Sequence, residues 1–303
     1  MDFYVSWSHS DAIFCDYFDS CPMLISAIPE NKNTLKRFSN YPSKLIIDSG
    51  ALYYAQKKGI KSLKEIMDTQ MFLIDSIPDT LPIKIVHLDE PLLDKNSLSE
   101  KYDSVERTLY NALEHMKLFN SIKSPKNVSM IGVIQGYDFP SIQYSIHELK
   151  KMGYTSFGLG SLLNKSAKEQ IKYIKYASSF VGPENLHIFG VTGIEQIKQM
   201  ANLKICSFDS SRPTMAAAFF QVMYSNPFRT YVISSSKVNK PQKRIEKPLN
   251  CNCPICLVNP HDILNISHRY YMKKRSVHNY YHIVKTIEKI NNVEGGNIGY
   301  KPG

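Results

Sequence analysis

Short runs of apolar and β-branched residues recur along the chain, and each has about the length of a buried strand. They lie at residues 2–8, 44–50, 83–90, 128–136, 154–161, 186–193, 203–210 and 230–236. Helical patterns lie between most of them, at residues 99–122, 140–153, 164–180, 193–203 and 214–226. Pro140 and Gly153 stand at the two ends of the second helical segment, as is typical of helix ends.

Strands that alternate with helices predict parallel βα units. Eight strands are the number that closes a (β/α)8 TIM barrel, so we expect an α/β protein with this barrel. An open doubly wound sheet is the alternative. The stretch at 234–250 is polar and basic and contains proline, which is typical of a linker. We therefore expect a barrel domain over residues 1–240 and a small C-terminal subdomain, with a closing helix, over residues 241–303.

Polar side chains follow several predicted strands at the point where each strand ends. Asp48, Asp89 and Asp209 each follow an apolar run, and Gln135 ends another. In a barrel these ends lie on one face, where active sites are found. A single Asp in this place can equally cap a helix, but three Asp and one Gln favour a site. Carboxylates and one amide suit a neutral heterocycle with donor groups on its edge, whereas a phosphate would require Arg, Lys or a glycine-rich loop.

The chain carries a formal net charge of +10, which favours nucleic acid as a partner. The alternative is that a Lys- and Asn-rich composition is simply basic. The residues that we expect to contact phosphates lie in the linker and near the C-terminus: Lys237, Lys240, Lys243, Arg244, Lys273, Lys274 and Arg275. The N-terminal sequence predicts no signal peptide, and no run is long enough for a membrane span. We therefore expect a soluble, cytoplasmic protein with reduced thiols.

Three of the six cysteines are gathered in the sequence CNCPIC, residues 251–256. Cys251, Cys253 and Cys256 are close enough in sequence to bind one tetrahedral Zn²⁺, which needs a fourth ligand. His278 and His282 are the candidates, because they lie four residues apart on one face of a predicted helix over 275–290. Four protein ligands leave no open position, so the zinc would be structural. An iron–sulfur site and unligated buried thiols are the alternatives.

The strand ends and the cysteine pattern together resemble the tRNA-guanine transglycosylase superfamily. The matching motifs, in the order of the family, are DSGA (48–51), LDE (88–90), GVIQG (132–136), GLGS (158–161), FGVTG (189–193), FDSSRPT (208–214), CNCPIC (251–256) and HNYY (278–281). They extend over nearly the whole chain. The resemblance implies a (β/α)8 barrel with a zinc-binding subdomain near the C-terminus.

The resemblance also implies roles for the strand-end residues. Asp209 matches the nucleophile that attacks C1′ of the nucleotide, and Asp48 matches the general acid/base. The residues that match substrate-binding positions are Ser49, Asp89, Gln135, Gly158, Leu159 and Gly160. For the zinc site, the family's His-Asn pair falls on His278, while His282 restores the family's usual spacing from the cysteines. We take His278 as the fourth ligand and keep His282 as the second choice.

The activity that the resemblance implies is the exchange of guanine in a polynucleotide for a 7-deazaguanine base, such as 7-cyano-7-deazaguanine. DNA is favoured over tRNA as the polymer, because a compact, basic and divergent barrel resembles the DNA-modifying branch, the 7-deazaguanine DNA transglycosylases. That branch is found chiefly in phages and in bacterial modification islands, so a phage-encoded protein that acts in the host cytoplasm is one alternative. A tRNA enzyme and a non-catalytic nucleic-acid-binding subunit are the alternatives, and a homodimer or an accessory protein is a further expected partner. The family's stacking aromatic residue is replaced by Leu52, so this contact is either moved to Tyr53 or lost.

Overall fold

The computed structural model describes residues 1–33, 35–57, 62–92, 97–122, 127–163, 165–237 and 243–295. Its internal contacts divide the chain into two compact units. The first unit contains residues 1–9 and 20–209, and the second contains residues 10–19 and 210–303. The domain boundary that we predicted after residue 240 lies outside the described residues and stays a prediction. The division into units falls earlier, directly after Asp209.

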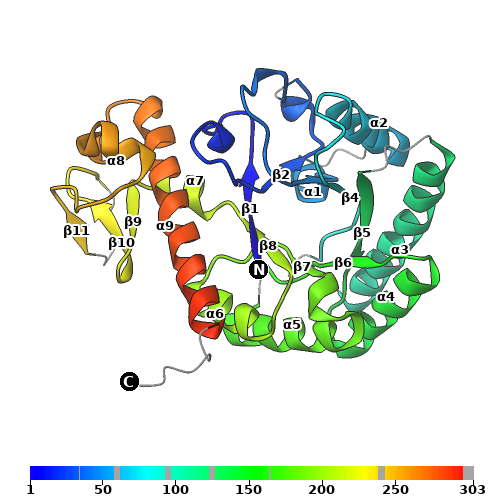
Figure 1. Ribbon diagram of the computed structural model, residues 1–303. Helices are drawn as coiled ribbons and strands as arrows, with labels where there is room; N and C mark the ends of the chain where they lie inside the picture. The colour runs from blue at the N-terminus through cyan, green and yellow to red at the C-terminus, as the bar shows by residue number, and fades with distance from the viewer. Residues whose placement is uncertain are drawn as a thin grey trace, which may run out of the picture. The chain divides into compact units, whose positions relative to one another are not determined.

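The first unit is a closed barrel of parallel strands in sequential order, β1 to β8, within the described residues (Figure 1). The strands are β1 (Asp2–Trp7), β2 (Met23–Ser26), β3 (Leu45–Asp48), β4 (Ile83–Val86), β5 (Val128–Ile134), β6 (Ser156–Leu159), β7 (Leu186–Ile188) and β8 (Ser207–Ser210). A hydrogen bond of 2.8 Å from the Asp2 N–H to the Cys206 carbonyl links the two ends of the barrel sequence. The predicted (β/α)8 class is therefore confirmed.

Two of the strand assignments from sequence were wrong, and they cancel in the count of eight. The barrel strand β2 was missed, although its four residues make it as long as β3, β4, β6 and β8, which were identified. The run at 230–236 was counted instead, and it lies largely in β10 (Phe228–Ile233) of the second unit. Periodicity identifies a strand, but it does not say which sheet the strand joins.

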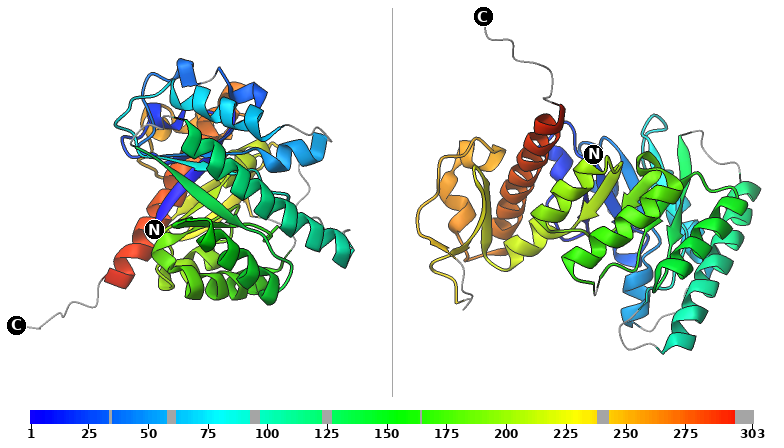
Figure 2. Two further views of the ribbon diagram at one scale, coloured as in Figure 1. Left: turned by 90° about the vertical axis from the view of Figure 1, so that its right-hand side faces the viewer. Right: turned by 90° about the horizontal axis from the view of Figure 1, so that it is seen from below.

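The helices of the first unit connect successive strands (Figures 1 and 2). They are α1 (Ala51–Lys57), α2 (Leu63–Ile74), α3 (Leu98–Ser121), α4 (Phe139–Lys151), α5 (Ala167–Val181) and α6 (Ile194–Asn202), with short 3₁₀ helices at Pro29–Asn31, Leu35–Arg37 and Pro183–Asn185. Four of them begin at a capping box, in which a side chain satisfies the free N–H groups of the first turn: Ser62, Ser97, Asp138 and Ser166. These caps fix where the helices start.

The centre of the barrel is filled by apolar side chains from successive strands. Among them are Tyr4, Leu24, Ile46, Val86, Ile131 and Val133, and each is at least 94% buried. Phe189, which follows β7, packs against this cluster from a partly buried position. A filled core leaves the carboxyl ends of the strands as the place for a pocket.

The second unit contains a three-stranded sheet and a long helix. Its elements are a 3₁₀ helix (Phe14–Asp16), α7 (Arg212–Ala218), β9 (Gln221–Ser225), β10 (Phe228–Ile233), β11 (Arg244–Ile245), α8 (Pro254–Val258), a 3₁₀ helix (Pro260–Leu264) and α9 (Arg269–Gly295). The sheet order is β11-β10-β9. The helix predicted over 214–226 was only half right, because its second half forms β9.

Asn279 of α9 joins this helix to the sheet. Its side-chain oxygen accepts from the Met223 N–H at 2.9 Å, and its amide donates to the carbonyls of Gln221 and Pro213. The side chain is fully buried, so these bonds fix α9 against β9. Among the described residues, no helix is both long enough and apolar enough to cross a membrane.

Candidate active site and metal centre

A pocket of about 270 Å³ in the first unit brings the strand-end carboxylates together. Its polar lining consists of Ser6, Ser26, Asp48, Asp89, Gln135, Ser161 and Asp209. Its apolar walls include Leu24, Leu52, Val86, Val133, Leu162, Leu163 and Phe189. Apolar walls with a few converging polar groups are typical of a small-molecule site. No Lys or Arg among the described residues lines this pocket.

Asp209 is held at the end of β8 by three donors. The Ser6 hydroxyl lies 2.6 Å from Oδ2, and the Gly190 N–H lies 3.0 Å from Oδ1. The His187 Nε2 atom lies 3.3 Å from Oδ1, while its Nδ1 atom contacts the Ser207 hydroxyl at 2.9 Å. The Asp209 residue is 94% buried, so these contacts fix the direction of its carboxylate. All three partners of Asp209 belong to the barrel, which disfavours the alternative that Asp209 only caps a helix.

Asp48 lies at the end of β3 and lines the same pocket. Burial raises its pKa, and the charge of Asp209 adds to this effect. Hydrogen bonds from the Gly50 N–H (2.9 Å) and the Ser26 hydroxyl (3.2 Å) act in the opposite direction. A raised pKa makes a carboxyl group easier to protonate, which suits a group that both takes up and releases a proton.

Asp89 and Gln135 form a pair at the ends of the neighbouring strands β4 and β5. The Gln135 Nε2 atom donates to Asp89 Oδ2 at 2.5 Å, and the Gln135 side chain is 98% buried. Burial, with a smaller contribution from the charge of Asp48, raises the pKa of Asp89 to about 7. The pocket therefore contains three carboxylates in three different environments, which is how one site separates acid, base and nucleophile.

The remaining predicted substrate-binding residues lie less directly at the pocket. Gly160 lines it, but its N–H donates to the Ile134 carbonyl at 3.0 Å and is already engaged. Ser49, Gly158 and Leu159 are not among the lining residues, and the Ser49 side chain is fully buried. The Ser49 N–H instead favours the ionised form of Asp48. Their roles in substrate binding stay predictions.

Sequence reasoning missed several groups that shape the pocket. Phe189 lines it, and Gly158 leaves the necessary space, because a Cβ atom there would lie 2.3 Å from the Phe189 ring. Tyr53, the aromatic candidate from sequence, does not line the pocket. Its ring packs edge-on against Tyr54, and its hydroxyl donates to Glu30 at 2.5 Å.

A buried histidine supports the segment that carries Asp89. His87 Nε2 accepts from the Val133 N–H at 2.7 Å, so the proton lies on Nδ1, which donates to the Leu88 carbonyl at 3.0 Å. Burial lowers the pKa of His87 to about 4, which keeps the ring neutral. A histidine within an apolar run, two residues before Asp89, was the available signal in the sequence.

Gln70 of α2 links the two strands that precede Asp48 and Asp89. Its amide nitrogen donates to the carbonyls of Ile47 (3.2 Å) and Val86 (2.8 Å). Its oxygen contacts His115 Nε2 at 3.0 Å, and burial lowers the pKa of His115 to about 3. A fully buried amide therefore bridges the two paired strands near their carboxyl ends.

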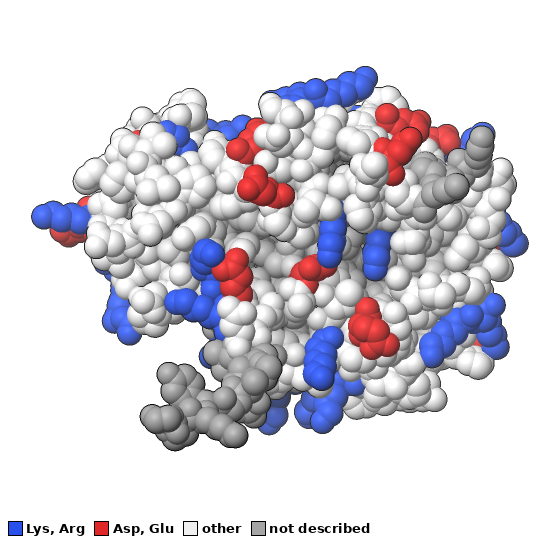
Figure 3. All heavy atoms as spheres, in the orientation of Figure 1, with Lys and Arg blue, Asp and Glu red and all other residues white. Residues whose placement is uncertain are grey.

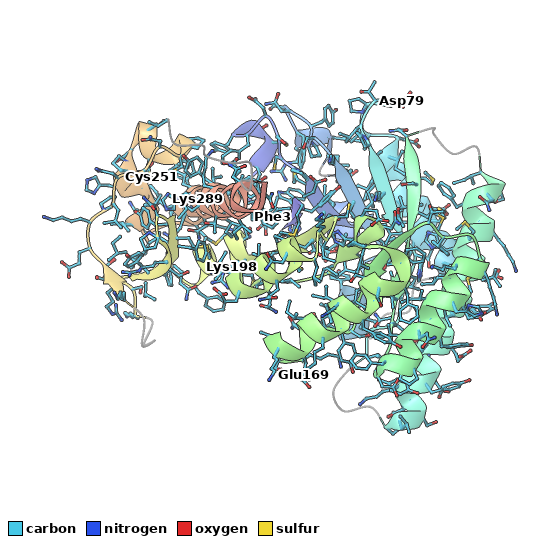
Figure 4. All side chains as sticks on the ribbon, turned by 60° about the horizontal axis from the view of Figure 1, so that its bottom comes forward. Phe3, Asp79, Glu169, Lys198, Cys251 and Lys289 are labelled. Atoms are coloured by element: carbon cyan, nitrogen blue, oxygen red, sulfur yellow. The ribbon has the colours of Figure 1, made fainter. Side chains whose placement is uncertain are left out.

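The cysteine segment forms a separate cluster in the second unit (Figure 4 labels Cys251 in the segment and Lys289 on α9). Ligand atoms of Cys251, Cys253, Cys256 and His278 all lie within 4.8 Å of one another. The His278 Nδ1 atom lies 3.7, 3.4 and 3.4 Å from the three sulfur atoms in that order. Tetrahedral zinc with its usual bond lengths separates sulfur and nitrogen ligands by about 3.6 Å. The residues therefore fit a zinc ion.

The neighbours of the two histidines favour His278 as the fourth ligand. Its Nε2 atom lies 2.9 Å from the Met223 carbonyl, which requires the proton on Nε2 and leaves Nδ1 free for the metal. His282 has the opposite arrangement. Its Nδ1 accepts from the Ser225 N–H at 3.1 Å, so its Nε2 is protonated and donates to the Cys251 sulfur at 3.1 Å. We therefore expect His282 to support the Cys251 thiolate.

Basic and acidic residues are both exposed on the face that Figure 3 shows. On the face in Figure 3, Lys and Arg side chains alternate with Asp and Glu. Of the predicted phosphate contacts, Lys237, Lys243 and Arg244 are exposed, while Lys240 lies outside the described residues. Lys274 pairs with Asp262.

The prediction for Arg275 was wrong. This side chain is 99% buried, and its guanidinium donates to the carbonyls of Ala217, Ile263 and Asn265 at 3.0 to 3.1 Å. Its role is therefore to hold the second unit together.

A (β/α)8 barrel with carboxylates at its strand ends, together with a Cys3His cluster, defines the class of guanine transglycosylases, which are pentosyltransferases. The family model described as TGT, queuine tRNA-ribosyltransferase, matches residues 25–293, and the chain belongs to this family. The Cys3His cluster is the site of the family's structural zinc ion.

Curated relatives with the name queuine tRNA-ribosyltransferase are similar at low identity. The protein of Chlamydia pneumoniae is 25% identical over 93% of this chain and 85% of its own length. That of Protochlamydia amoebophila is 24% identical over 80% of this chain, and that of Chlamydia caviae is 28% identical over 60%. The chain spans only 62% and 58% of the length of these last two relatives.

Proposed function

We propose that this protein replaces guanine in a polynucleotide with a 7-deazaguanine base, such as 7-cyano-7-deazaguanine, by double displacement. The observation that carries the proposal is the position of Asp209. Three donors aim its carboxylate, and it lines one pocket with Asp48 and Asp89. A displacement at carbon needs such a fixed approach direction.

Asp209 is the nucleophile of the proposed reaction. Its carboxylate oxygen attacks C1′, and the bond from C1′ to guanine N9 breaks with its electron pair on the base, which takes up a proton. In the second step the incoming base loses its N9 proton and attacks C1′, and the ester bond to Asp209 breaks. Two inversions retain the configuration at C1′ and require no redox or nucleotide cofactor.

Asp48 is the proposed general acid/base. Its raised pKa suits a group that gives a proton to the leaving guanine and takes one from the incoming base. It lines the pocket that also contains Asp209, so one base in the pocket can reach both groups. Exchange in a duplex requires that the target base first leaves its stack.

Asp89 and Gln135 are the proposed groups that recognise the base. An ionised Asp89 accepts from the donor edge of guanine, and the amide of Gln135 lies beside it. Phe189 is the aromatic lining residue, so we assign the contact with the face of the base to Phe189 in place of Tyr53. The contributions of Ser49, Gly158 and Leu159 follow the resemblance alone.

The proposal also includes a choice between DNA and tRNA as the polymer. DNA remains our first candidate, because the replacement of the stacking aromatic residue by Leu52 marks a divergent nucleotide site. The names of the relatives favour tRNA as the second candidate. A homodimer, an accessory protein and a cytoplasmic location stay predictions. Retention of all three carboxylates disfavours a non-catalytic subunit.

The direct test is incubation of the protein with 7-cyano-7-deazaguanine and either DNA or tRNA, followed by mass spectrometry of the nucleosides. We expect the modified nucleoside in one polymer only. The Asp209→Asn protein is the matched control and should be inactive. Modification of tRNA alone would overturn the choice of DNA and leave the chemistry intact. If neither polymer is modified while guanine is also not exchanged, the proposed function is wrong.

A further inference from the structure

We infer that Ser161 fixes the orientation of the Gln135 side-chain amide in the base pocket. The pocket would then prefer a purine that has a carbonyl at the edge facing Gln135 over a purine that has an amino group there. The inference rests on the proposed function, since it concerns the same pocket. Ser161 lines this pocket directly after Gly160. Sequence reasoning gave it no role.

The direction follows from a chain of hydrogen bonds. The Gly136 N–H donates to Ser161 Oγ at 3.3 Å, so the hydroxyl oxygen acts there as an acceptor. The hydroxyl proton is therefore directed to its other partner, the side-chain oxygen of Gln135. The Gln135 amide is thereby fixed with its oxygen on Ser161 and its nitrogen on Asp89, at 2.5 Å from Oδ2.

This arrangement makes Gln135 a donor toward the pocket. One amide proton goes to Asp89, the oxygen is taken by Ser161, and the second amide proton is left for a ligand. Two neighbouring backbone groups are already engaged. The Gly160 N–H already donates to Ile134, and the Leu159 carbonyl already accepts from the Phe189 N–H at 3.3 Å. A ligand carbonyl at this edge would bind, whereas an amino group would place donor against donor.

The backbone shows that the Ser161 hydroxyl is held in position at some cost. Ser161 has a φ of +58°, a left-handed conformation that favours glycine. Gly160 must lack a side chain, since a Cβ atom there would lie 2.8 Å from Gln135 Nε2. Gly160 and Ser161 therefore place a backbone without a side chain and a hydroxyl group against the same Gln135 amide.

Asp89 explains why the hydroxyl is needed. A charged Asp89 would orient the amide by itself, because a carboxylate only accepts. Burial raises the pKa of Asp89 to about 7, so a protonated form is also populated near neutral pH and could donate to a flipped amide. Ser161 removes this ambiguity by donating to the Gln135 oxygen in either state of Asp89.

The left-handed backbone provides a matched pair of variants. Ser161→Gly removes the hydroxyl and relieves the backbone, and Ser161→Ala removes the hydroxyl but keeps the Cβ atom. The two variants should differ in thermal stability, with Ser161→Gly the more stable. They should behave alike in base selectivity if the hydroxyl is the cause.

The test is direct calorimetric binding of free guanine and of 2,6-diaminopurine to the full-length protein at pH 6, without polynucleotide. We expect the wild type to prefer guanine, and both variants to lose at least about tenfold of this preference, the factor that about 1.4 kcal/mol of lost hydrogen bonding represents. If the wild type prefers guanine and both variants keep that preference, the inference about Ser161 is wrong and the proposed function stands. If only Ser161→Ala changes, backbone strain is the cause and the inference is likewise overturned. If the wild type binds neither base, the proposed function fails and the inference fails with it.

Discussion

In the cysteine cluster of the second unit, four ligand atoms lie within 4.8 Å of one another and converge on one point. In the pocket of the first unit, each carboxylate instead has its own partners: Ser6, His187 and Gly190 for Asp209, and Gln135 for Asp89. The cluster leaves no position for a substrate once a metal is bound. The pocket keeps about 270 Å³ of space in front of its ionisable groups.

The protonation states of the ionisable groups also differ between the cysteine cluster and the pocket. In the cluster, the Met223 carbonyl leaves one His278 nitrogen free for a metal. In the pocket, burial raises the pKa values of both Asp48 and Asp89, so protons remain exchangeable there. The comparison predicts opposite responses to mutation. Changes in the cluster should reduce stability, and changes in the pocket should reduce activity while stability is kept or raised.

The largest effect on stability is expected for Cys256→Ser. The variant should lose its zinc and at least about 3 kcal/mol of the free energy of unfolding, because structural zinc contributes on the order of 10 kcal/mol to folding. Metal analysis and urea unfolding measure both quantities. Cys206→Ser is the control, since Cys206 lies outside the cluster and should keep one zinc per chain. A Cys256→Ser protein with full zinc and unchanged stability would contradict the structural role of the cysteine cluster.

For the pocket, Asp48→Asn should lower the rate of guanine exchange by about 10²- to 10⁴-fold, the usual contribution of a general acid/base. Polymer affinity should stay within about threefold of the wild type, because phosphate contacts dominate it. Exchange kinetics with labelled guanine and a filter-binding assay separate the two. Equal losses in rate and in affinity would indicate that Asp48 binds substrate and does not transfer protons.

Asp89→Asn should stabilise the protein at high pH. Burial raises the pKa of Asp89 to about 7, so the folded state holds this proton more tightly than the unfolded state. The free energy of unfolding therefore falls as pH rises from about 4 to about 7. Removal of the charge should raise the free energy of unfolding by about 1 to 3 kcal/mol at pH 8 and leave it unchanged at pH 4.

Urea unfolding at both pH values tests this prediction. Asp79→Asn is the control, because Asp79 is exposed on the first unit, as its label in Figure 4 shows, and its change should have little effect at either pH. A gain for Asp89→Asn that is equal at pH 4 and pH 8 would contradict the assignment of the raised pKa to this residue.

The smallest effect is expected at the surface. Lys243→Ala should weaken polymer binding by less than about tenfold and lower the slope of log affinity against log salt by about 1, as for one phosphate contact. Lys285→Ala is the control, because its ammonium pairs with Glu288 at 2.7 Å. The same slope in both variants would place the nucleic acid away from Lys243.

The barrel could be predicted because apolar runs and helical segments alternate along most of the first unit. The count of eight nevertheless depended on two errors. The strand β2 was overlooked although β3 has the same length, and β10 has the same β-branched character as a barrel strand. Membership of a sheet depends on pairing partners, which local periodicity does not encode.

The candidate site was predictable to the extent that chemistry follows a strand end. Asp48, Asp89, Gln135 and Asp209 were found in this way, and all four line the pocket. Ser161 was not found, because its importance depends on a left-handed backbone angle and on the direction of a neighbouring amide. Neither has a signature in the local sequence.

In the proposed reaction Asp209 forms a covalent bond to C1′, and a denaturing gel of the protein with labelled polymer and incoming base detects this bond. The wild type should show a shifted, labelled protein band. Asp209→Ala should show none, and Asp209→Asn should show nearly none, because an amide is a poor nucleophile. The Asp48→Asn protein serves as the control with an intact nucleophile and should retain polymer binding. A labelled adduct in Asp209→Ala would contradict the account, since the nucleophile would then lie elsewhere.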